Sequence, residues 1–254
     1  MLKETILAVK NISKYFFHEQ GIFRSQQSQV LALQRVNFSV EEFATLGIVG
    51  ESGSGKTTLA KIILQLIPPT CGEVIFNPDK IQNLRKDVQI IFQNPYNSLN
   101  PKIRILETIS EPLLIHKIVP KKKARDKAVA LLGMVGLEDK ILNRFPIEFS
   151  GGQRQRICIA RALASEPKFI VLDEPISSLD LTVQAEILEL FLALKDKFKL
   201  TYIFISHNLA VIKHMADRVL VMQNGEILEE ASSKEIFSAP RHPYTRLLLE
   251  SAKA

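Results

Sequence analysis

Apolar runs and apolar residues at regular spacing divide this chain into strand-like and helix-like segments. An uninterrupted apolar run at residues 169–172 and mainly apolar runs at residues 44–49 and 201–205 predict strands that are buried within a sheet. Helical segments are predicted at residues 59–67, 151–164 and 181–198. Since strands and helices follow one another along the chain, we predict an α/β fold built on a mainly parallel sheet.

Further strands are predicted on either side of the first buried run. Apolar residues alternate weakly over residues 5–9 and more clearly over residues 30–40. The polar residues 18–29 between them predict an extended loop or a hairpin. Pro68 and Pro69 are expected to end the helix at 59–67. Two more strands are predicted at residues 72–76 and 88–92.

The character of the chain changes between residues 94 and 149. After a loop-like stretch, helical spacing of apolar residues appears at residues 103–114 and 120–135. We therefore predict a mainly helical insert between strands of the α/β core. Further on, Asn224-Gly225 is the turn pair of a hairpin between strands 219–222 and 226–229, and two short helices are expected to follow.

The amino-acid composition is that of a globular protein and says little about the chemistry of a functional site. Of 254 residues, 46% are hydrophobic, yet no apolar run approaches the ~20 residues that a membrane-spanning helix needs. The net charge of +6 admits an anionic partner, but the basic run at 121–125 lacks interleaved aromatic residues and predicts a solvated helix start. Cys71 and Cys158 match no metal or redox spacing, so we interpret them as buried or neutral thiols.

A glycine-rich loop carries the first clear chemical signal. It follows the apolar run at 44–49, precedes the predicted helix, and reads Gly50-Glu51-Ser52-Gly53-Ser54-Gly55-Lys56-Thr57-Thr58. The pattern G-x-x-x-x-G-K-[ST] between a strand and a helix predicts a phosphate-binding loop, whose backbone N–H groups and helix N-terminus attract phosphate. Lys56 is expected to reach the β- and γ-phosphates of a nucleoside triphosphate, and Thr57 to contact Mg²⁺.

Further polar residues occur in a specific order after this loop. They are Gln93 at a strand end, Ser150-Gly151-Gly152-Gln153 at a helix start, Asp173-Glu174 at the end of a buried strand, Ser177-Ser178-Leu179-Asp180, and His207. Together with the phosphate loop, this series resembles the ATPase subunits of ABC transporters. The resemblance covers essentially the whole chain. It implies a P-loop NTPase core with an N-terminal antiparallel β subdomain and a helical insert subdomain.

The resemblance also implies how one ABC ATPase domain divides. Residues 1–93 and 150–230 would form the nucleotide-binding core, residues 94–149 the helical insert, and residues 231–254 a short C-terminal helical extension. A local departure is Glu42-Phe43-Ala44, where the family usually has a Gly-Glu turn. This departure is expected to alter only a connection outside the site.

Roles for individual residues follow from the resemblance and from the chemistry of ATP hydrolysis. Glu174 is the expected general base for the attacking water, and His207 is expected to contact the γ-phosphate and orient that water. Mg²⁺ prefers hard oxygen ligands, which Thr57, Gln93 and Asp173 would supply directly or through water. Tyr15 occupies the position from which this family stacks an aromatic ring on adenine, although packing in the core would also explain it.

The Ser150–Gln153 signature implies a dimer. In this family the start of the signature helix meets the γ-phosphate held by an opposing subunit, with Asp180 near the interface. The chain would therefore pair with itself or with a sister ATPase chain, sandwiching ATP and Mg²⁺. Expected partners are two membrane-spanning permease subunits and, indirectly, an extracytoplasmic substrate-binding protein. Such an ATPase would lie peripherally on the cytoplasmic face of the inner membrane, and no nucleic acid is expected.

Finer motifs narrow the transported substrate to two classes. The segments 92–101, 143–146 and 241–245 closely resemble those of subunits that import peptides or nickel. The rival function is a soluble ABC ATPase that acts on DNA or the ribosome, but the zinc-type cysteine pairs, long coiled coils or second cassette of such proteins are missing from the sequence. A P-loop kinase or GTPase is disfavoured because it leaves Ser150–Gln153 unexplained.

Overall fold

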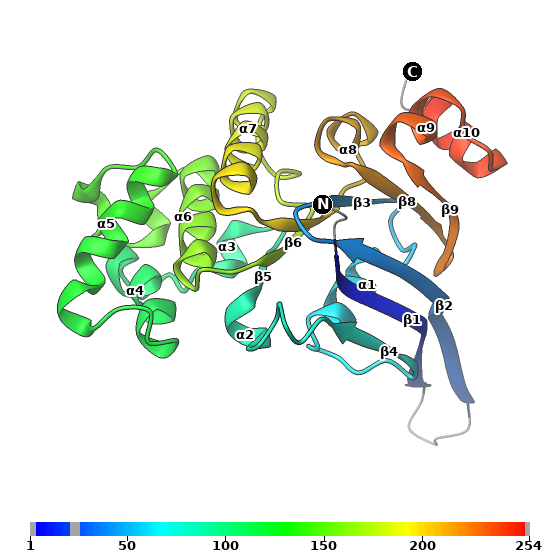
Figure 1. Ribbon diagram of the computed structural model, residues 1–254, viewed down its shortest axis with the longest axis horizontal. Helices are drawn as coiled ribbons and strands as arrows, with labels where there is room; N and C mark the ends of the chain where they lie inside the picture. Colours follow the sequence, from blue (N-terminus) through cyan, green and yellow to red (C-terminus); the bar gives the residue numbers. More distant parts are fainter. Residues whose placement is uncertain (1–3, 21–25, 252–254) are drawn as a thin grey trace. The chain divides into compact units, whose positions relative to one another are not determined.

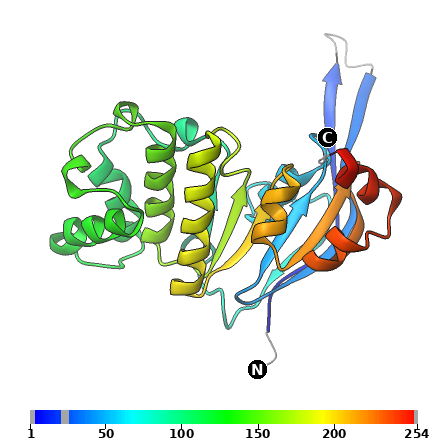
Figure 2. The same cartoon turned by 90° about the horizontal axis from the view of Figure 1, so that it is seen from above.

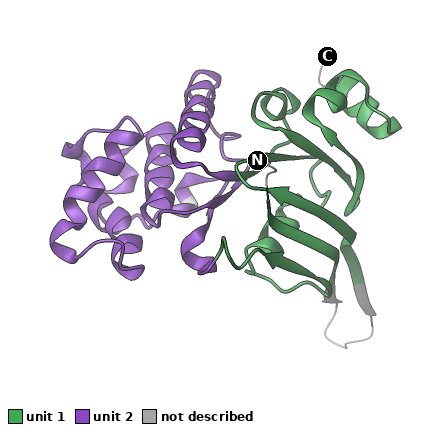
Figure 3. Cartoon of the chain, in the orientation of Figure 1, with its two compact units in different colours: residues 1–81, 202–254 green, residues 82–201 purple. Residues whose placement is uncertain are grey.

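The computed structural model describes residues 4–20 and 26–251 of the chain. These residues belong to two units, one comprising residues 1–81 and 202–254 and the other residues 82–201 (Figure 3). The first unit contains the glycine-rich loop, and the second contains the Ser150–Gln153 segment. The predicted division into core, insert and extension stays a prediction.

The N-terminal part of the first unit forms an antiparallel sheet of three strands (Figure 1). Its order is β2-β1-β4, with β1 (Thr5–Gln20), β2 (Gln26–Glu41) and β4 (Cys71–Phe76). The polar stretch 18–29 is thus part of a hairpin, although residues 21–25 lie outside the described residues. The predicted N-terminal antiparallel β subdomain is confirmed.

Strand β1 is longer than the predicted 5–9 because an irregularity in pairing does not end it. The register with β2 shifts between Val9 and Ile12 and again between Ile12 and Lys14. Asn11 takes a left-handed φ of 51°, and its N–H donates to Asn37 Oδ1 at 2.8 Å. A bulge of this kind uses up residues without ending the ladder, so the alternation that marks a strand is lost in the sequence while the strand continues.

The first unit also contains parallel strands around β3 (Thr45–Val49), all of whose residues are buried. Strand β3 pairs in parallel with β7 (Thr201–Ile205) and with β8 (Arg218–Gln223), and β9 (Glu226–Ser232) continues antiparallel from β8. The predicted Asn224-Gly225 turn is present, with positive φ at both residues. The helices of this unit are α1 (Lys56–Ile63), α8 (Leu209–Met215), α9 (Ser233–Ser238) and α10 (Pro243–Ser251).

Two helices of this unit differ from the prediction. Helix α1 ends at Ile63 rather than at residue 67, because Gln65 adopts a left-handed φ of 53° and the Leu66 N–H reaches back to the Lys61 carbonyl. Pro68 and Pro69 therefore come too late to end it. Helix α8 was not predicted, and it packs closely on β3: a Cβ added at Gly47 would lie 2.8 Å from Ile212 Cγ2.

In the second unit two parallel strands are accompanied by helices. Strand β5 (Val88–Ile91) pairs with β6 (Phe169–Asp173). The helical segments are α2 (Leu84–Asp87), α3 (Pro95–Ser98), α4 (Ile105–Ile115), η1 (Lys121–Lys123), α5 (Ala124–Met134), η2 (Asp139–Ile141), η3 (Pro146–Glu148), α6 (Gly151–Ala164) and α7 (Leu181–Phe198). Helices α6 and α7 run side by side (Figure 2). The predicted helices between residues 94 and 149 are confirmed, whereas α2 and α3 were not predicted.

The two cysteines have different environments. Cys158 is buried in α6, whereas Cys71 is exposed at the start of β4. Burial raises the pKa of the Cys158 thiol to about 11, against the opposing effect of the Arg161 charge. Since only the thiolate reacts readily, Cys158 is inert at neutral pH.

We predict that a thiol reagent such as DTNB labels one cysteine per folded chain at pH 8, and that this cysteine is Cys71. Cys158 should react only after denaturation, because unfolding exposes it and returns its pKa to the ordinary range. A Cys71→Ser variant is the matched control and should show almost no labelling until denaturant is added. Rapid labelling of that variant in the folded state would contradict the assignment.

Candidate nucleotide site

The glycine-rich loop connects β3 to α1 in the first unit, as the sequence predicts. The Lys56 side chain is buried and turns back over the loop. Its Nζ donates to the carbonyl oxygens of Gly50 at 2.8 Å and Glu51 at 2.7 Å, and it lies 3.2 Å from Ser54 Oγ. The ammonium group is therefore held inside the curve of the loop, where a phosphate-binding lysine is required.

Two glycines of the loop are required by close backbone contacts. A Cβ at Gly50 would lie 2.1 Å from the Met222 carbonyl oxygen, and a Cβ at Gly55 would lie 2.5 Å from the Ala32 carbonyl oxygen. Gly55 also has a φ of 100°, which other residues rarely adopt. The loop is thus pressed against β8 on one side and β2 on the other.

The hairpin turn between β8 and β9 also contacts this loop. The Gly225 N–H donates to the Ser54 carbonyl at 3.1 Å, and the Gly225 carbonyl accepts from the Gln34 N–H at 2.9 Å. One glycine of the turn therefore bridges the phosphate loop and β2. From the sequence Asn224-Gly225 was interpreted only as a turn, and no residue pattern there indicates what the turn contacts.

Two other predicted site residues lie in the same unit. His207 follows β7, and its neighbour Ser206 donates from its N–H to the Ile48 carbonyl of β3 at 3.2 Å. Because β3 and β7 are parallel neighbours, the loop and His207 follow the same ends of adjacent strands. Tyr15 is half-buried and pairs with Leu31, the residue before Ala32, whose carbonyl approaches Gly55.

The second unit brings Gln93 and Glu174 together. They follow the parallel neighbours β5 and β6, and Gln93 Nε2 donates to Glu174 Oε2 at 3.2 Å. Glu174 adopts a positive φ of 50°, and its carbonyl accepts from the Ser177 hydroxyl at 3.1 Å. Asp173 is buried at the end of β6. The turn after β6 thus fixes a carboxylate beside the predicted Gln93.

At the predicted helix start, Ser150 and Gln153 form a capping box. Ser150 Oγ accepts from the Gln153 N–H at 3.3 Å, and the Ser150 N–H donates to Gln153 Oε1 at 3.1 Å. A Cβ at Gly152 would lie 2.6 Å from Val183 Cγ1 of α7. Asp180 caps that helix, with Oδ1 accepting from the Val183 N–H at 3.0 Å. The sequence did not predict this cap on α7.

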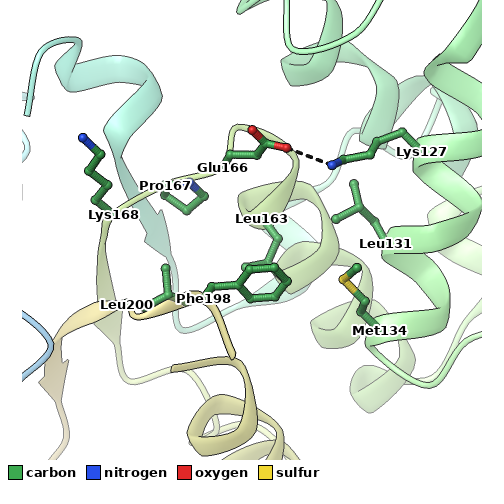
Figure 4. Close-up of a pocket in the computed structure, with 9 residues that line it drawn as sticks. All are labelled: Lys127, Leu131, Met134, Leu163, Glu166, Pro167, Lys168, Phe198 and Leu200. Atoms are coloured by element: carbon green, nitrogen blue, oxygen red, sulfur yellow. Dashed lines mark hydrogen bonds and ion pairs between the residues drawn. The ribbon is translucent and has the colours of Figure 1, made fainter. Parts of the chain in front are cut away.

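A pocket of about 330 Å³ in the second unit holds none of the predicted site residues (Figure 4). Its lining is largely apolar, with Leu131 and Met134 from α5 and Phe198 from the end of α7. Lys127 Nζ and Glu166 Oε1 form an ion pair at 2.8 Å beside it. Lys127 is thereby engaged by a carboxylate, and the apolar side chains around it are not those of a phosphate site.

The family model described as ABC transporter matches residues 33–177 of the chain. This match takes in the phosphate loop, Gln93, the Ser150–Gln153 signature and Glu174. The chain belongs to the ABC transporter family. It is an ATP-binding ATPase of that family, and the predicted P-loop NTPase fold is confirmed.

The sequence similarity of this ABC ATPase to its relatives extends over nearly its full length. It is 43% identical to the oligopeptide transport ATP-binding protein AppF of Bacillus subtilis, over 98% of the chain and 78% of the relative. It is 42% identical to the di/tripeptide transport ATP-binding protein DppF of Pseudomonas aeruginosa, over 99% of the chain and 80% of the relative. The glutathione import ATP-binding protein GsiA of Escherichia coli is 44% identical over 97% of the chain, which spans 41% of that longer protein.

Solved structures agree with this assignment. A dimeric ATP-binding cassette in a post-hydrolysis state with ADP and Pi is 30% identical, with a TM-score of 0.75 over 90% of this chain and 99% of that one. CbiO1 of Clostridium perfringens, part of an ABC transporter complex, is 25% identical with a TM-score of 0.76 over 98% of this chain and 100% of that one. In the described parts of the ABC ATPase, no helix is long and apolar enough to cross a membrane.

The contacts of the phosphate loop predict unequal effects of two glycine substitutions. Gly50→Ala should destabilise the protein by about 1–3 kcal/mol more than Gly53→Ala, because its Cβ would strike the Met222 carbonyl. At Gly53 no atom lies within 4 Å of an added Cβ, so only the cost of a positive φ remains. Urea unfolding of both variants measures the difference, and equal midpoints with equal slopes would contradict the packing described for Gly50.

Proposed function

We propose that this ABC ATPase is the ATP-hydrolysing subunit of an importer for short peptides. The observation that carries the proposal is its identity of 42–43%, over 98–99% of the chain, to relatives named for oligopeptide and di/tripeptide transport. Nickel, the other substrate predicted from the sequence, has no such support among these relatives. The soluble alternative, an ATPase acting on DNA or the ribosome, is not favoured, because the relatives are named as transport and import proteins.

The phosphate loop is proposed to bind the triphosphate of ATP. Support comes from the buried Lys56 ammonium, from the glycine-rich loop around it and from the N-terminus of α1. The Lys56 ammonium, held beside the Gly50 and Glu51 carbonyls, would contact β- and γ-phosphate oxygens. A charge already held within the loop needs little reorganisation to make these contacts.

Mg²⁺ is proposed to be held by the hydroxyl of Thr57, the side-chain oxygen of Gln93 and the carboxylate of Asp173. These are hard oxygen donors of the kind that Mg²⁺ prefers. Since Gln93 uses Nε2 to donate to Glu174, its Oε1 is the atom that suits a cation. When bound, Mg²⁺ would neutralise charge that develops on the phosphates.

Glu174 is proposed as the general base and His207 as the group that orients the attacking water. The hydrogen bond from Gln93 and the turn closed by Ser177 hold the Glu174 carboxylate in a defined position. A positioned carboxylate can take the proton of water as the water attacks the γ-phosphate. His207 follows the strand next to the one that leads into the phosphate loop.

The functional unit is proposed to be a dimer, either of two identical chains or with a sister ATPase chain. The first N–H groups of α6, at Gly151 and Gly152, would bind the γ-phosphate held by the partner, with Asp180 near the interface. Two permease subunits and, indirectly, an extracytoplasmic binding protein complete the proposed transporter. The ATPase would then lie on the cytoplasmic face of the inner membrane.

Tyr15→Ala should weaken binding of adenine nucleotides by about 1–3 kcal/mol if the ring stacks on the base. Fold stability should change little, because Tyr15 is only half-buried. Isothermal titration with Mg-ATP, together with thermal melting, separates the two effects. A variant that melts far below the parent yet binds ATP normally in its folded fraction would show that Tyr15 is a packing residue.

Glu174→Gln should lower ATP turnover by roughly 10²–10⁴-fold while preserving ATP affinity, since the amide cannot take a proton. The measurement uses the ATPase reconstituted with its permease subunits and binding protein in proteoliposomes, with phosphate release and uptake of a labelled tripeptide as readouts. The parental complex should import the tripeptide and the variant should not.

Lys56→Ala is the matched control, because it should abolish nucleotide binding itself. Parental turnover in the Glu174→Gln complex would remove Glu174 from the mechanism. Uptake of Ni²⁺ without uptake of the tripeptide by the parental complex would overturn the proposed substrate class.

A further inference from the structure

One peptide group of the phosphate loop, between Gly50 and Glu51, is held from both sides. Its carbonyl oxygen accepts from Lys56 Nζ at 2.8 Å, and its N–H donates to the Tyr244 hydroxyl at 3.4 Å. Tyr244 lies in α10, 193 positions further along the chain than Glu51. A residue of the C-terminal helix thus contacts the loop that is proposed to bind phosphate.

The start of α10 is anchored to β9 through the backbone just before Tyr244. The carboxylate of Glu229 in β9 accepts from the N–H groups of Arg241 at 2.8 Å and His242 at 3.0 Å. His242 Nδ1 in turn accepts from the Tyr244 N–H at 3.2 Å. Glu229 and Tyr244 are both buried, with 8% and 7% of their surface exposed. The hydroxyl is therefore presented to Glu51 from a backbone that is itself tied to β9.

The protonation states of Glu229 and Tyr244 suit these hydrogen bonds. Burial favours a higher pKa for the Glu229 carboxyl, but the hydrogen bonds that it accepts outweigh burial and hold the pKa below its usual range. The carboxylate is thus ionised at neutral pH and can accept both backbone N–H groups. Burial raises the pKa of Tyr244, so its hydroxyl keeps its proton under the same conditions.

We propose that Tyr244 is a positioning residue for the phosphate loop, and the proposal rests on the nucleotide role proposed for that loop. Lys56 holds the carbonyl of this peptide group, and Tyr244 holds its N–H from the other side. By keeping the peptide in place Tyr244 preserves the curve of the loop and lowers the cost of binding a triphosphate.

Tyr244→Phe removes the hydroxyl and keeps the ring, so it tests the contact directly in the purified full chain. Loss of one neutral hydrogen bond should weaken ATP binding roughly two- to ten-fold. The Glu51 amide, which loses its acceptor, should exchange its hydrogen faster. Titration with Mg-ATP, residue-resolved amide exchange by NMR and thermal melting provide the three readouts.

Arg246→Gln is the matched control. Arg246 holds the same segment through hydrogen bonds to the carbonyls of Pro240 at 3.0 Å and Arg241 at 3.3 Å, and these bonds do not involve the phosphate loop. The control should therefore leave ATP affinity and Glu51 exchange at the parental level, even if it lowers the melting temperature.

Weaker ATP binding and faster Glu51 exchange in Tyr244→Phe, with neither change in Arg246→Gln, would support the proposal. Parental affinity in Tyr244→Phe would overturn it, as would equal losses of affinity in both variants or weaker binding with unchanged Glu51 exchange. Lys56→Ala and the parental chain are titrated alongside. If the parental chain and Lys56→Ala bind ATP equally, the nucleotide role of the loop fails, whereas a normal Lys56 effect with no Tyr244 effect overturns only the role of Tyr244.

Discussion

The close approach of the phosphate-loop backbone to its neighbours is the constraint on which the first unit depends. Gly50 meets the Met222 carbonyl and Gly55 meets the Ala32 carbonyl at distances that exclude any side chain. A loop made of exposed glycines would pay a high conformational entropy cost to hold one shape. Here contacts from β2, β8, the Asn224-Gly225 turn and Tyr244 hold that shape.

Strand order turns distant sequence segments into neighbours in both units. Parallel β3 and β7 lead into the phosphate loop and His207, and parallel β5 and β6 lead into Gln93 and Glu174. In open α/β sheets, ligands bind just beyond the carboxyl ends of the strands, which is where these polar side chains lie. The buried strands supply the rigidity, and the turns that follow them supply the chemistry.

Segments whose signal is local could be predicted well from the sequence. The apolar runs gave β3, β6 and β7 to within a residue, and Ser150 and the Asn224-Gly225 pair marked a helix start and a turn correctly. Errors occurred where backbone conformation overrides residue type. Gln65 ends α1 with a left-handed φ that no residue pattern predicts. Asn11 interrupts the alternation of β1 without ending the strand.

Contacts made over long sequence separations could not be predicted in the same way. Residues 241–245 form a motif in the sequence, but only the structure places Tyr244 against Glu51 and Glu229 against the N–H groups of Arg241 and His242. The hydrogen bond from the Gly225 N–H to the Ser54 carbonyl is another contact over a long sequence separation. Such contacts depend on the path of the whole sheet, which no short window of sequence contains. The candidate residues were therefore predictable, and the groups that hold them in place were not.

The start of α6 shows that a structural role and a proposed ligand role can belong to the same residues. Ser150 and Gln153 satisfy one another in a capping box, and this uses the N–H groups of Ser150 and Gln153 themselves. The first N–H groups of a helix have no partner within it, so those of Gly151 and Gly152 keep their capacity to donate. The glycines add no side chain over these two groups, and Gly152 packs on Val183 at a distance that leaves no space for one. The capping box thus fixes the direction of two N–H donors without consuming them, which is the property that an anion site at a helix start requires.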